Sequence, residues 1–179
     1  DAIRGYMKIT RRDANGKPKR ALYNGERMML EMLANANGER PIYMAITVGS
    51  ENHLGMGNHF MQEGLAYRFT PFDTDKLDSK IDSEKMYDNL MNKFKFGGID
   101  KPGIYIDENV MRMCYTHRRI FTQLVGQLIK EGKKDKALAA LDYAEKMIPS
   151  YNVPYDWANG AFPLAESYSQ LGPHAKATK

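Results

Sequence analysis

The segment that most constrains the fold of this chain is residues 121–149, FTQLVGQLIKEGKKDKALAALDYAEKMIP. Its apolar residues recur at the spacing of a helical turn, first as Phe121, Leu124 and Leu128 and then as Ala137, Leu141 and Ala144. Gly132 separates the two runs, because glycine adopts the left-handed conformation of a helix C-cap without strain. Pro149 then ends the second run. The sequence therefore predicts a helical hairpin with small alanines at the contact.

This hairpin is similar to a tetratricopeptide repeat, a helical unit that builds surfaces for holding partners. Residues 164–172, LAESYSQLG, repeat the pattern of the first helix with Leu164, Ala165 and Tyr168, and they also close on a glycine. The linker 150–157, SYNVPYDW, is longer than a minimal repeat needs. Because the last expected unit is incomplete, we expect the chain to be a fragment or its end to be covered by another segment.

Residues 1–103 follow a different pattern, in which short strand-like runs alternate with helical ones. Strands are expected at 6–10, 42–48 and 65–72, and helices at 25–36, 60–62 and 83–96. The run 42–48, IYMAITV, predicts a buried strand because it is rich in β-branched and aromatic residues. One apolar stripe is expected on helix 25–36, made of Met28, Met29, Met32, Leu33 and Ala36.

We therefore predict an α+β fold that is mostly helical. A small α/β layer of about three strands, residues 1–103, would pack on a tetratricopeptide-like helical array, residues 104–179. The net charge is +4. Basic residues surround the turn Asn15-Gly16 instead of alternating with aromatic ones; they are Arg11, Arg12, Lys17, Lys19 and Arg20. This favours a solvated loop over a nucleic-acid site, with an anionic membrane surface as the next possibility.

No set of residues has the spacing of a catalytic or metal site. The four histidines are His53, His59, His117 and His174, and none pairs with another at helical spacing as a zinc site requires. His117 is expected on the inward face of a long helix as a core or interface residue, and the single cysteine, Cys114, is expected to be a small buried side chain of the same helix. The glycines of loop 49–58, GSENHLGMGN, could cradle a phosphate, but their spacing matches no phosphate-binding motif and favours a structural loop. We predict no catalytic residue, no metal and no cofactor.

The linker carries the candidate binding site, made of Tyr151, Tyr155, Asp156 and Trp157. Aromatic rings beside a carboxylate can stack on a sugar and bond its hydroxyls, or can anchor a peptide. The alternative, which we favour, is that Pro154, Tyr155 and Trp157 pack the loop against the helices.

Several segments resemble the C-terminal soluble region of a bacterial family of multi-pass membrane proteins of unknown function. They are ERMMLEMLAN, RPIYMAITV, EGLAYRFTP, MYDNLMNKFKFGG, YIDENVMRM, and EGKKDKALAALDYAEKMIP with VPYDW. The membrane part of that family resembles protein O-mannosyltransferases, whose catalytic acidic residues lie between early membrane spans. The resemblance thus implies the periplasmic face of the inner membrane and gives no residue of this chain a catalytic role.

The leading hypothesis is a non-catalytic extracytoplasmic accessory domain of a membrane glycosyltransferase-like protein. It would hold an exported protein, a glycan acceptor or the membrane portion of its own parent chain, and no nucleic acid. The alternative is a carbohydrate-binding module that uses the insert Tyr155–Trp157. A third hypothesis is an enzyme that binds a phosphorylated ligand at loop 49–58.

Overall fold

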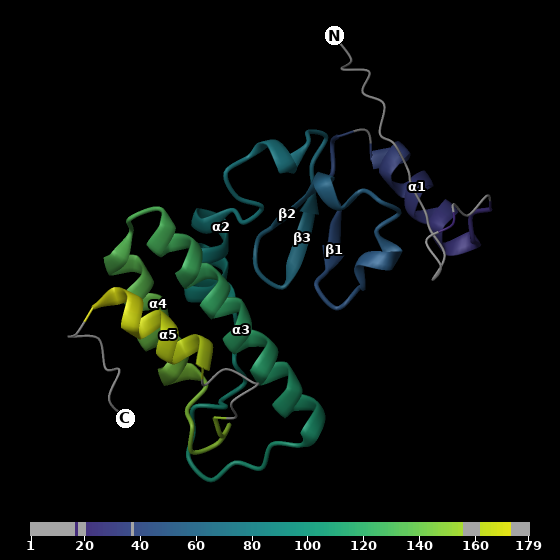
Figure 1. Cartoon of the computed structure of the whole chain (residues 1–179). Coiled ribbons are helices and arrows are strands. Elements are labelled where there is room, and N and C mark those ends of the chain that lie inside the picture. The colour runs from purple at the N-terminus through teal and green to yellow at the C-terminus, as the bar shows by residue number, and fades with distance from the viewer. Residues whose placement is uncertain (1–16, 18–20, 37, 156–161, 173–179) are drawn as a thin grey trace. The chain divides into compact units, whose positions relative to one another are not determined.

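The computed structural model describes residues 17, 21–36, 38–155 and 162–172 (Figure 1). The chain forms two compact units, Asp1–Asp82 and Ser83–Lys179. The strand expected at 6–10 lies outside the described residues, as does the basic cluster apart from Lys17. The division into domains 1–103 and 104–179 stays a prediction.

Helix α1, Asn24–Ala36, confirms the helix expected at 25–36. Its first turn is closed reciprocally: the carbonyl of Tyr23 accepts the N–H group of Glu26 at 3.0 Å, and the Glu26 carboxylate accepts the N–H group of Tyr23 at 2.7 Å. Only part of the expected stripe faces the core, since Met28 and Met32 are 61% and 58% exposed. Leu30, which the prediction omitted, packs against the core instead.

Three short antiparallel strands follow, β1 (Tyr43–Ala45), β2 (Phe60–Gln62) and β3 (Ala66–Phe69), in the order β1-β3-β2. Strand β3 confirms the strand expected at 65–72 and lies at the centre. The prediction for 42–48 was wrong in length and burial, because β1 is a short edge strand with Tyr43 and Ala45 exposed.

The helix expected at 60–62 was also wrong, because these residues form β2. Gly64, with φ 133°, allows the chain to reverse directly into β3. The resulting hairpin places Phe60 opposite Phe69 and carries Phe60 into the core with Leu54 and Met56. Short 3-10 turns complete the unit at Ser50–Asn52 (η1), Gly57–His59 (η2) and Thr74–Lys76 (η3).

The second unit is helical and confirms the expected helices. It contains α2 (Ser83–Asp88), a π-helical turn η4 (Asn89–Lys93), α3 (Glu108–Lys130), α4 (Lys134–Met147) and α5 (Phe162–Leu171). Together with the small sheet, they confirm a mostly helical α+β fold. None of the helices in the described part combines the length and apolar character of a membrane span.

The predicted hairpin is formed by α3 and α4, and its two apolar runs are buried. Gly132 has φ 74° and closes α3 as expected. The N–H groups of Gly132 and Lys133 bond the carbonyls of Ile129 and Leu128 at 3.0 and 2.8 Å, which is the Schellman pattern. Asp107 caps the start of α3, well before the first residue of the predicted hairpin. Membership of a tetratricopeptide array stays a prediction.

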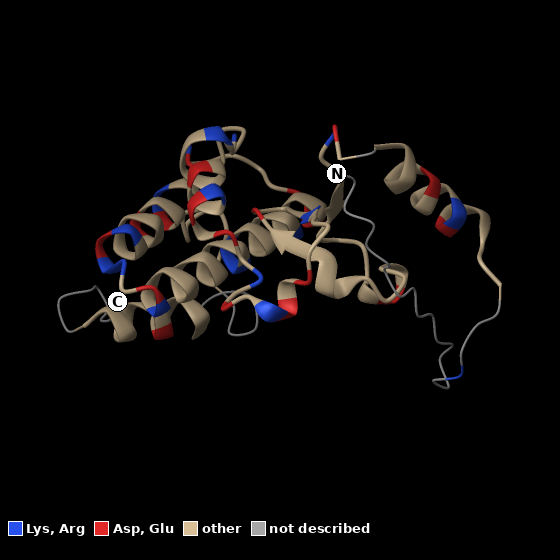
Figure 2. Cartoon of the chain, turned by 90° about the horizontal axis from the view of Figure 1, so that it is seen from above, with Lys and Arg blue, Asp and Glu red and all other residues tan. Residues whose placement is uncertain are grey.

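Helix α5 buries Leu164 and Tyr168 as expected, and Gly172 after it has φ 112°. Ala165 is exposed, however, and Ser167 is buried in its place. Positively and negatively charged positions are interspersed along the helices (Figure 2). This distribution is typical of solvated helix faces.

Candidate functional site

The predicted aromatic site lies in the loop that follows α4. Tyr151 is 61% exposed and Tyr155 is 41% exposed. Asp156 and Trp157, the other two predicted residues, lie outside the described residues. The structure therefore shows two of the four predicted side chains, both partly open to solvent.

This loop is tied to the turn that precedes α3. The hydroxyl of Tyr151 donates to the carbonyl of Asp100 at 2.5 Å, and the side-chain amide of Asn152 donates to the carbonyls of Ile99 and Lys101 at 2.7 and 2.6 Å. Because these contacts join residues about fifty positions apart, they order two loops together. Tyr105 follows this turn and is 91% exposed.

A residue that the sequence interpretation missed, Arg118 of α3, holds the same loop from inside. Its side chain is buried, with 1% of its surface exposed. The guanidinium donates to the carbonyls of Ile148 at 2.9 Å, Val153 at 2.5 Å and Pro154 at 3.2 Å. An arginine suits this position because its planar fork presents several donors in fixed directions. Arg118 thus satisfies the carbonyls that a loop leaving a helix would otherwise bury unpaired.

The ring of Tyr155 covers the same guanidinium, with 4.4 Å between the Arg118 Cζ atom and the ring centroid. Burial lowers the pKa of Arg118, an effect that the nearby Tyr155 and Tyr115 side chains and Glu145 oppose. Burial also raises the pKa of the Tyr155 phenol, and Glu145 raises it further. The phenol is therefore neutral at physiological pH, and one face of its ring is occupied by Arg118.

A sequence signal for Arg118 exists. It continues the apolar stripe of α3, in which Cys114, Arg118, Phe121, Val125 and Leu128 recur at three- and four-residue intervals and are all buried. A charged residue inside such a stripe is rarely buried without several hydrogen-bond partners. The stripe therefore indicates a residue that organises surrounding carbonyls.

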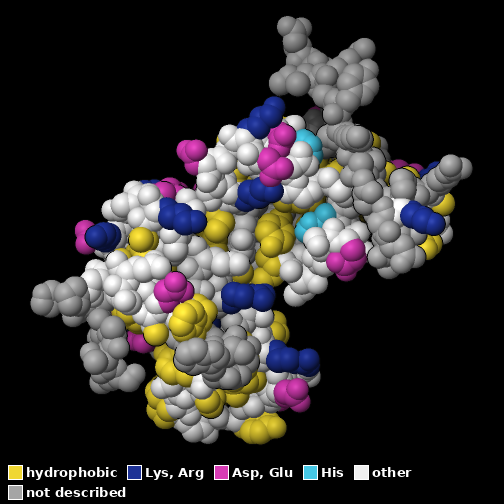
Figure 3. Space-filling model, in the orientation of Figure 1, with side chains coloured by type: hydrophobic (Ala, Val, Ile, Leu, Met, Phe, Trp, Pro, Cys, Tyr) yellow, Lys and Arg dark blue, Asp and Glu magenta, His cyan; other side chains and the backbone are white. Residues whose placement is uncertain are grey.

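Exposed apolar side chains gather at this end of the second unit. Large ones in this part of the sequence are Ile104, Tyr105, Met113, Tyr151 and Tyr155. Figure 3 shows hydrophobic surface, in yellow, at the lower end of the view, where the turn before α3 and the loop after α4 lie in Figure 1. Clustered aromatic exposure of this kind is typical of an interaction surface.

Loop 49–58 is part of the core of the first unit. Leu54 and Met56 are 0% and 1% exposed, and Leu54 has a φ of 53°, which few side chains adopt. The N–H groups of Asn52, His53 and Met56 bond carbonyls within the loop at 2.8 to 3.1 Å. Since a phosphate cradle needs such groups to be free, the structure favours the structural role that the glycine spacing predicts.

The histidines contact main-chain carbonyls and aromatic rings. His53 lies 3.2 Å from the carbonyl of Val48, and His59 lies 3.2 Å from that of Thr70. His117 is half-buried, bonds the carbonyl of Met113 at 2.7 Å and contacts the rings of two phenylalanines, as expected for a core residue. His174 lies outside the described residues. Within the described part, no three metal-ligating side chains come together.

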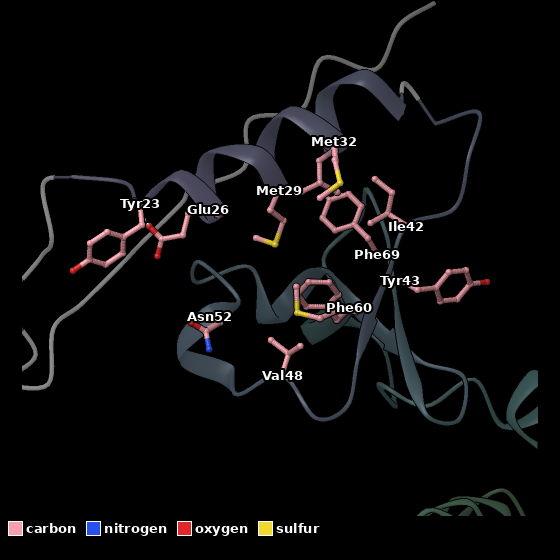
Figure 4. A pocket seen from close by; sticks show the side chains of 13 residues that line it. Tyr23, Glu26, Met29, Met32, Ile42, Tyr43, Val48, Asn52, Phe60 and Phe69 are labelled. Atoms are coloured by element: carbon pink, nitrogen blue, oxygen red, sulfur yellow. Dashed lines mark hydrogen bonds between the residues drawn. The ribbon is translucent and has the colours of Figure 1, made fainter.

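The first unit contains a pocket that the sequence interpretation did not predict, about 550 Å³ in volume. It lies between α1 and the sheet, where Met29, Met32, Phe60 and Phe69 converge (Figure 4). Most of its lining is apolar; Tyr23, Glu26 and Asn52 supply polar atoms. The pocket exists because α1 contacts the core without burying any of its residues completely.

A second pocket, of about 570 Å³, continues along α1. Met32 and Ile42 line both pockets, so the two adjoin. The second ends at the turn after α1, where Glu39, Arg40 and Pro41 line it. We call the two pockets together the α1 groove.

Comparison with protein families gives a match over residues 6–87, to the family described as TMEM260-associated domain 2. Comparisons with curated proteins and with solved structures give no match. The matched stretch contains the described strands, α1 and most of α2, so it includes the α1 groove. The bacterial origin that the resemblance implies stays a prediction. Over residues 6–87 this chain is thus similar to a domain associated with the membrane protein TMEM260.

Proposed function

We propose that this chain is a non-catalytic accessory domain of a membrane glycosyltransferase-like protein, and that it holds a polypeptide. That polypeptide is an exported protein, a glycan acceptor or the membrane portion of the parent chain. The similarity of residues 6–87 to a TMEM260-associated domain supports the connection to a membrane protein. An extracytoplasmic position, on the periplasmic face of the inner membrane, belongs to the same proposal.

The observation that carries the holding role is the pair of exposed tyrosines, Tyr105 and Tyr151, on ordered loops. Tyrosine offers a large contact area with a polar tip, and it is enriched at the centres of protein interfaces. The loop of Tyr151 is fixed by the hydrogen bond from buried Arg118 to the Val153 carbonyl and by the bond from the Tyr151 hydroxyl to the Asp100 carbonyl in the turn before α3. Since the loop is already ordered, binding a partner loses less conformational entropy there.

Photo-cross-linking in the intact parent protein tests this proposal. A photoreactive phenylalanine analogue replaces Tyr105, and the control carries it at Lys130, an exposed residue at the other end of α3. We expect position 105 to form adducts with an exported protein or with the parent's own membrane portion, identified by mass spectrometry. Equal adducts from both positions, or none from position 105, would contradict the proposal.

A second candidate function is a carbohydrate-binding module that uses the insert Tyr155–Trp157. The favouring observation is that Tyr151 and Tyr155 are both exposed within one loop. Arg118 already covers one face of the Tyr155 ring, so a sugar could stack only on the other face. Titration with simple sugars, followed by tryptophan fluorescence, separates the two functions, because only the second predicts a saturable change.

A further inference from the structure

The outer edge of β1 directs main-chain groups away from the sheet. Phe69 N–H bonds the carbonyl of Ile42 at 2.8 Å, and Ile46 N–H bonds that of Leu65 at 3.2 Å. In an antiparallel pair, successive residues of a strand direct their main-chain groups alternately toward the partner strand and away from it. Ile42 and Ile46 face the β3 side, so Tyr43 and Ala45 direct their N–H groups outward. In the described part of the chain, β1 pairs with β3 alone.

The opposite edge of the sheet differs, because a chain segment covers it. Gln62 N–H in β2 bonds the carbonyl of Lys80 at 2.8 Å, and the Gln62 carbonyl accepts Asp82 N–H at 3.0 Å. Among the described strands, β1 is therefore the one with no segment paired along its outer edge, although the outward carbonyl of Ala45 accepts the N–H group of Val48 at 3.0 Å. An open edge is a template for one more strand.

The α1 groove reaches this edge. Ile42, Tyr43 and Met44 all line the pocket beneath α1, although the Tyr43 side chain itself points away from it (Figure 4). A strand added beside β1 would alternate its side chains between the two faces of the sheet. Those on the α1 side would enter the groove.

The chemistry of the groove selects among occupants. Outward N–H groups on β1 match the carbonyls of an extended polypeptide, which a hydrocarbon chain lacks. Among the described residues that line the pocket beneath α1 there is no Lys or Arg, and Arg40 lines only the adjoining pocket at the far end of the groove. Its walls include Met29, Met32 and Met44, whose flexible thioethers adapt to differently shaped apolar side chains.

We propose that an extended apolar segment of a partner polypeptide pairs with β1 and places apolar side chains in the α1 groove. The inference rests on the proposed function, because it names the kind of polypeptide segment that the chain holds. It adds a recognition mode, strand addition to a sheet edge, in which main-chain bonds give affinity and alternate side chains give selectivity.

Two methionines of α1 supply a matched pair of variants for the groove. Met32 is 58% exposed and lines both pockets, whereas Met28 is 61% exposed and lines neither. The probe is a random linear peptide library, selected on the full chain. We expect Met32→Arg to weaken the selected apolar peptides by about tenfold or more, and Met28→Arg to leave their affinity unchanged. Equal effects of the two variants would overturn the groove as the site.

The strand edge is tested at Ala45. Ala45→Pro removes the outward N–H group, and an edge strand tolerates a proline at a position whose N–H group faces outward. Ala45→Val keeps the N–H group and is the control. We expect only the proline variant to lose peptide binding, while its thermal unfolding temperature stays close to that of the unsubstituted chain. Bound peptide should also slow amide exchange at Tyr43 and Ala45, with Ile46, whose N–H group already bonds the carbonyl of Leu65, as the internal reference.

Three outcomes overturn the inference: no peptide is selected, bound peptide leaves the exchange of Tyr43 and Ala45 unchanged, or phosphatidylcholine vesicles occupy the groove and exclude peptide. The proposed function is tested separately by cross-linking from position 105. Adducts there without peptide binding at β1 would reject the strand-addition mode alone, whereas loss of both would reject the holding role as well.

Discussion

Arg118 and Tyr155 form a stacked pair, with 4.4 Å between the guanidinium carbon and the centroid of the phenol ring. The same guanidinium bonds three carbonyls of the segment after α4, so one buried side chain of α3 connects α3 to that whole segment. Tyr151, which carries the proposed contact surface, lies within this segment. The order of the surface thus depends on a residue that does not belong to it.

We expect Arg118→Met to destabilise the chain by about 3 kcal/mol, because removing the donors leaves buried carbonyls unpaired at about 1–3 kcal/mol each. Methionine keeps most of the apolar stem, so lost packing contributes little. Urea unfolding followed by circular dichroism measures the effect. The free energy of unfolding of Arg118→Lys should lie between those of the unsubstituted chain and Arg118→Met, since lysine keeps the charge but not the planar fork.

The neighbouring Arg119 is exposed on the same helix, so Arg119→Met is the matched control. It should change the free energy of unfolding by less than about 0.5 kcal/mol, as most surface substitutions do. A similar loss of stability in Arg118→Met and Arg119→Met would show that the buried hydrogen bonds do not stabilise the loop.

The sequence predicted the helical unit well, because its helices are long and strongly periodic. The buried positions of the α3–α4 hairpin and its glycine cap follow from spacing alone. The short strands were harder. Phe60–Gln62 contains three residues, too few to show a period, and only its pairing with β3 makes it a strand. Likewise, β1 has a strand-like composition, but its edge position leaves it exposed.

The candidate sites depended still more on tertiary contacts. Sequence placed Tyr151 and Tyr155 in one loop, yet the partner of Tyr151 is Asp100, 51 positions away. The partner of Tyr155 is Arg118 on another helix. The α1 groove could not be predicted at all, because its volume results from how loosely α1 packs on the strands.

Cys114 should resist thiol reagents in the folded chain. Its side chain is 2% exposed, and burial raises the pKa of the thiol, so little reactive thiolate forms at neutral pH. We expect alkylation by iodoacetamide to follow the unfolded fraction as urea increases. Mass spectrometry of quenched samples measures the labelled fraction. Rapid labelling without urea would show that the start of α3 opens independently of the rest.

Acid should weaken the contact between α2 and α4. Lys133 and Lys136 donate to the Glu84 carboxylate at 2.6 and 2.7 Å, and these bonds lower the pKa of Glu84 from 4.5 to about 2. Because the folded pKa lies below the unfolded one, the contribution is complete above about pH 4.5 and disappears as the pH falls through 2.

Glu84→Gln should therefore make the free energy of unfolding fall less steeply as the pH is lowered from about 4.5 through 2. Glu84 is exposed, so the increment will be small and will shrink in high salt. The control is Glu166→Gln, which removes an exposed carboxylate from α5. If the free energy of unfolding depended on acid pH in the same way in the Glu84 variant and the unsubstituted chain, the two ion pairs would not stabilise the unit.

Two glycines at the α3–α4 hairpin should respond to alanine with opposite signs. Gly132 has φ 74°, which alanine adopts only with strain, so Gly132→Ala should destabilise by about 1 kcal/mol. Gly126 lies inside α3, and within the described part of the chain an added Cβ atom there meets nothing within 4 Å beyond its chain neighbours and the backbone of its own helix. Gly126→Ala should therefore stabilise by about 0.5–1 kcal/mol, because alanine restricts the unfolded chain and favours a helix. Thermal unfolding of both variants beside the parent measures the signs. If both alanines destabilised the chain, the space beside Gly126 would be needed by a neighbouring segment, and if neither did, the left-handed cap would not set the end of α3.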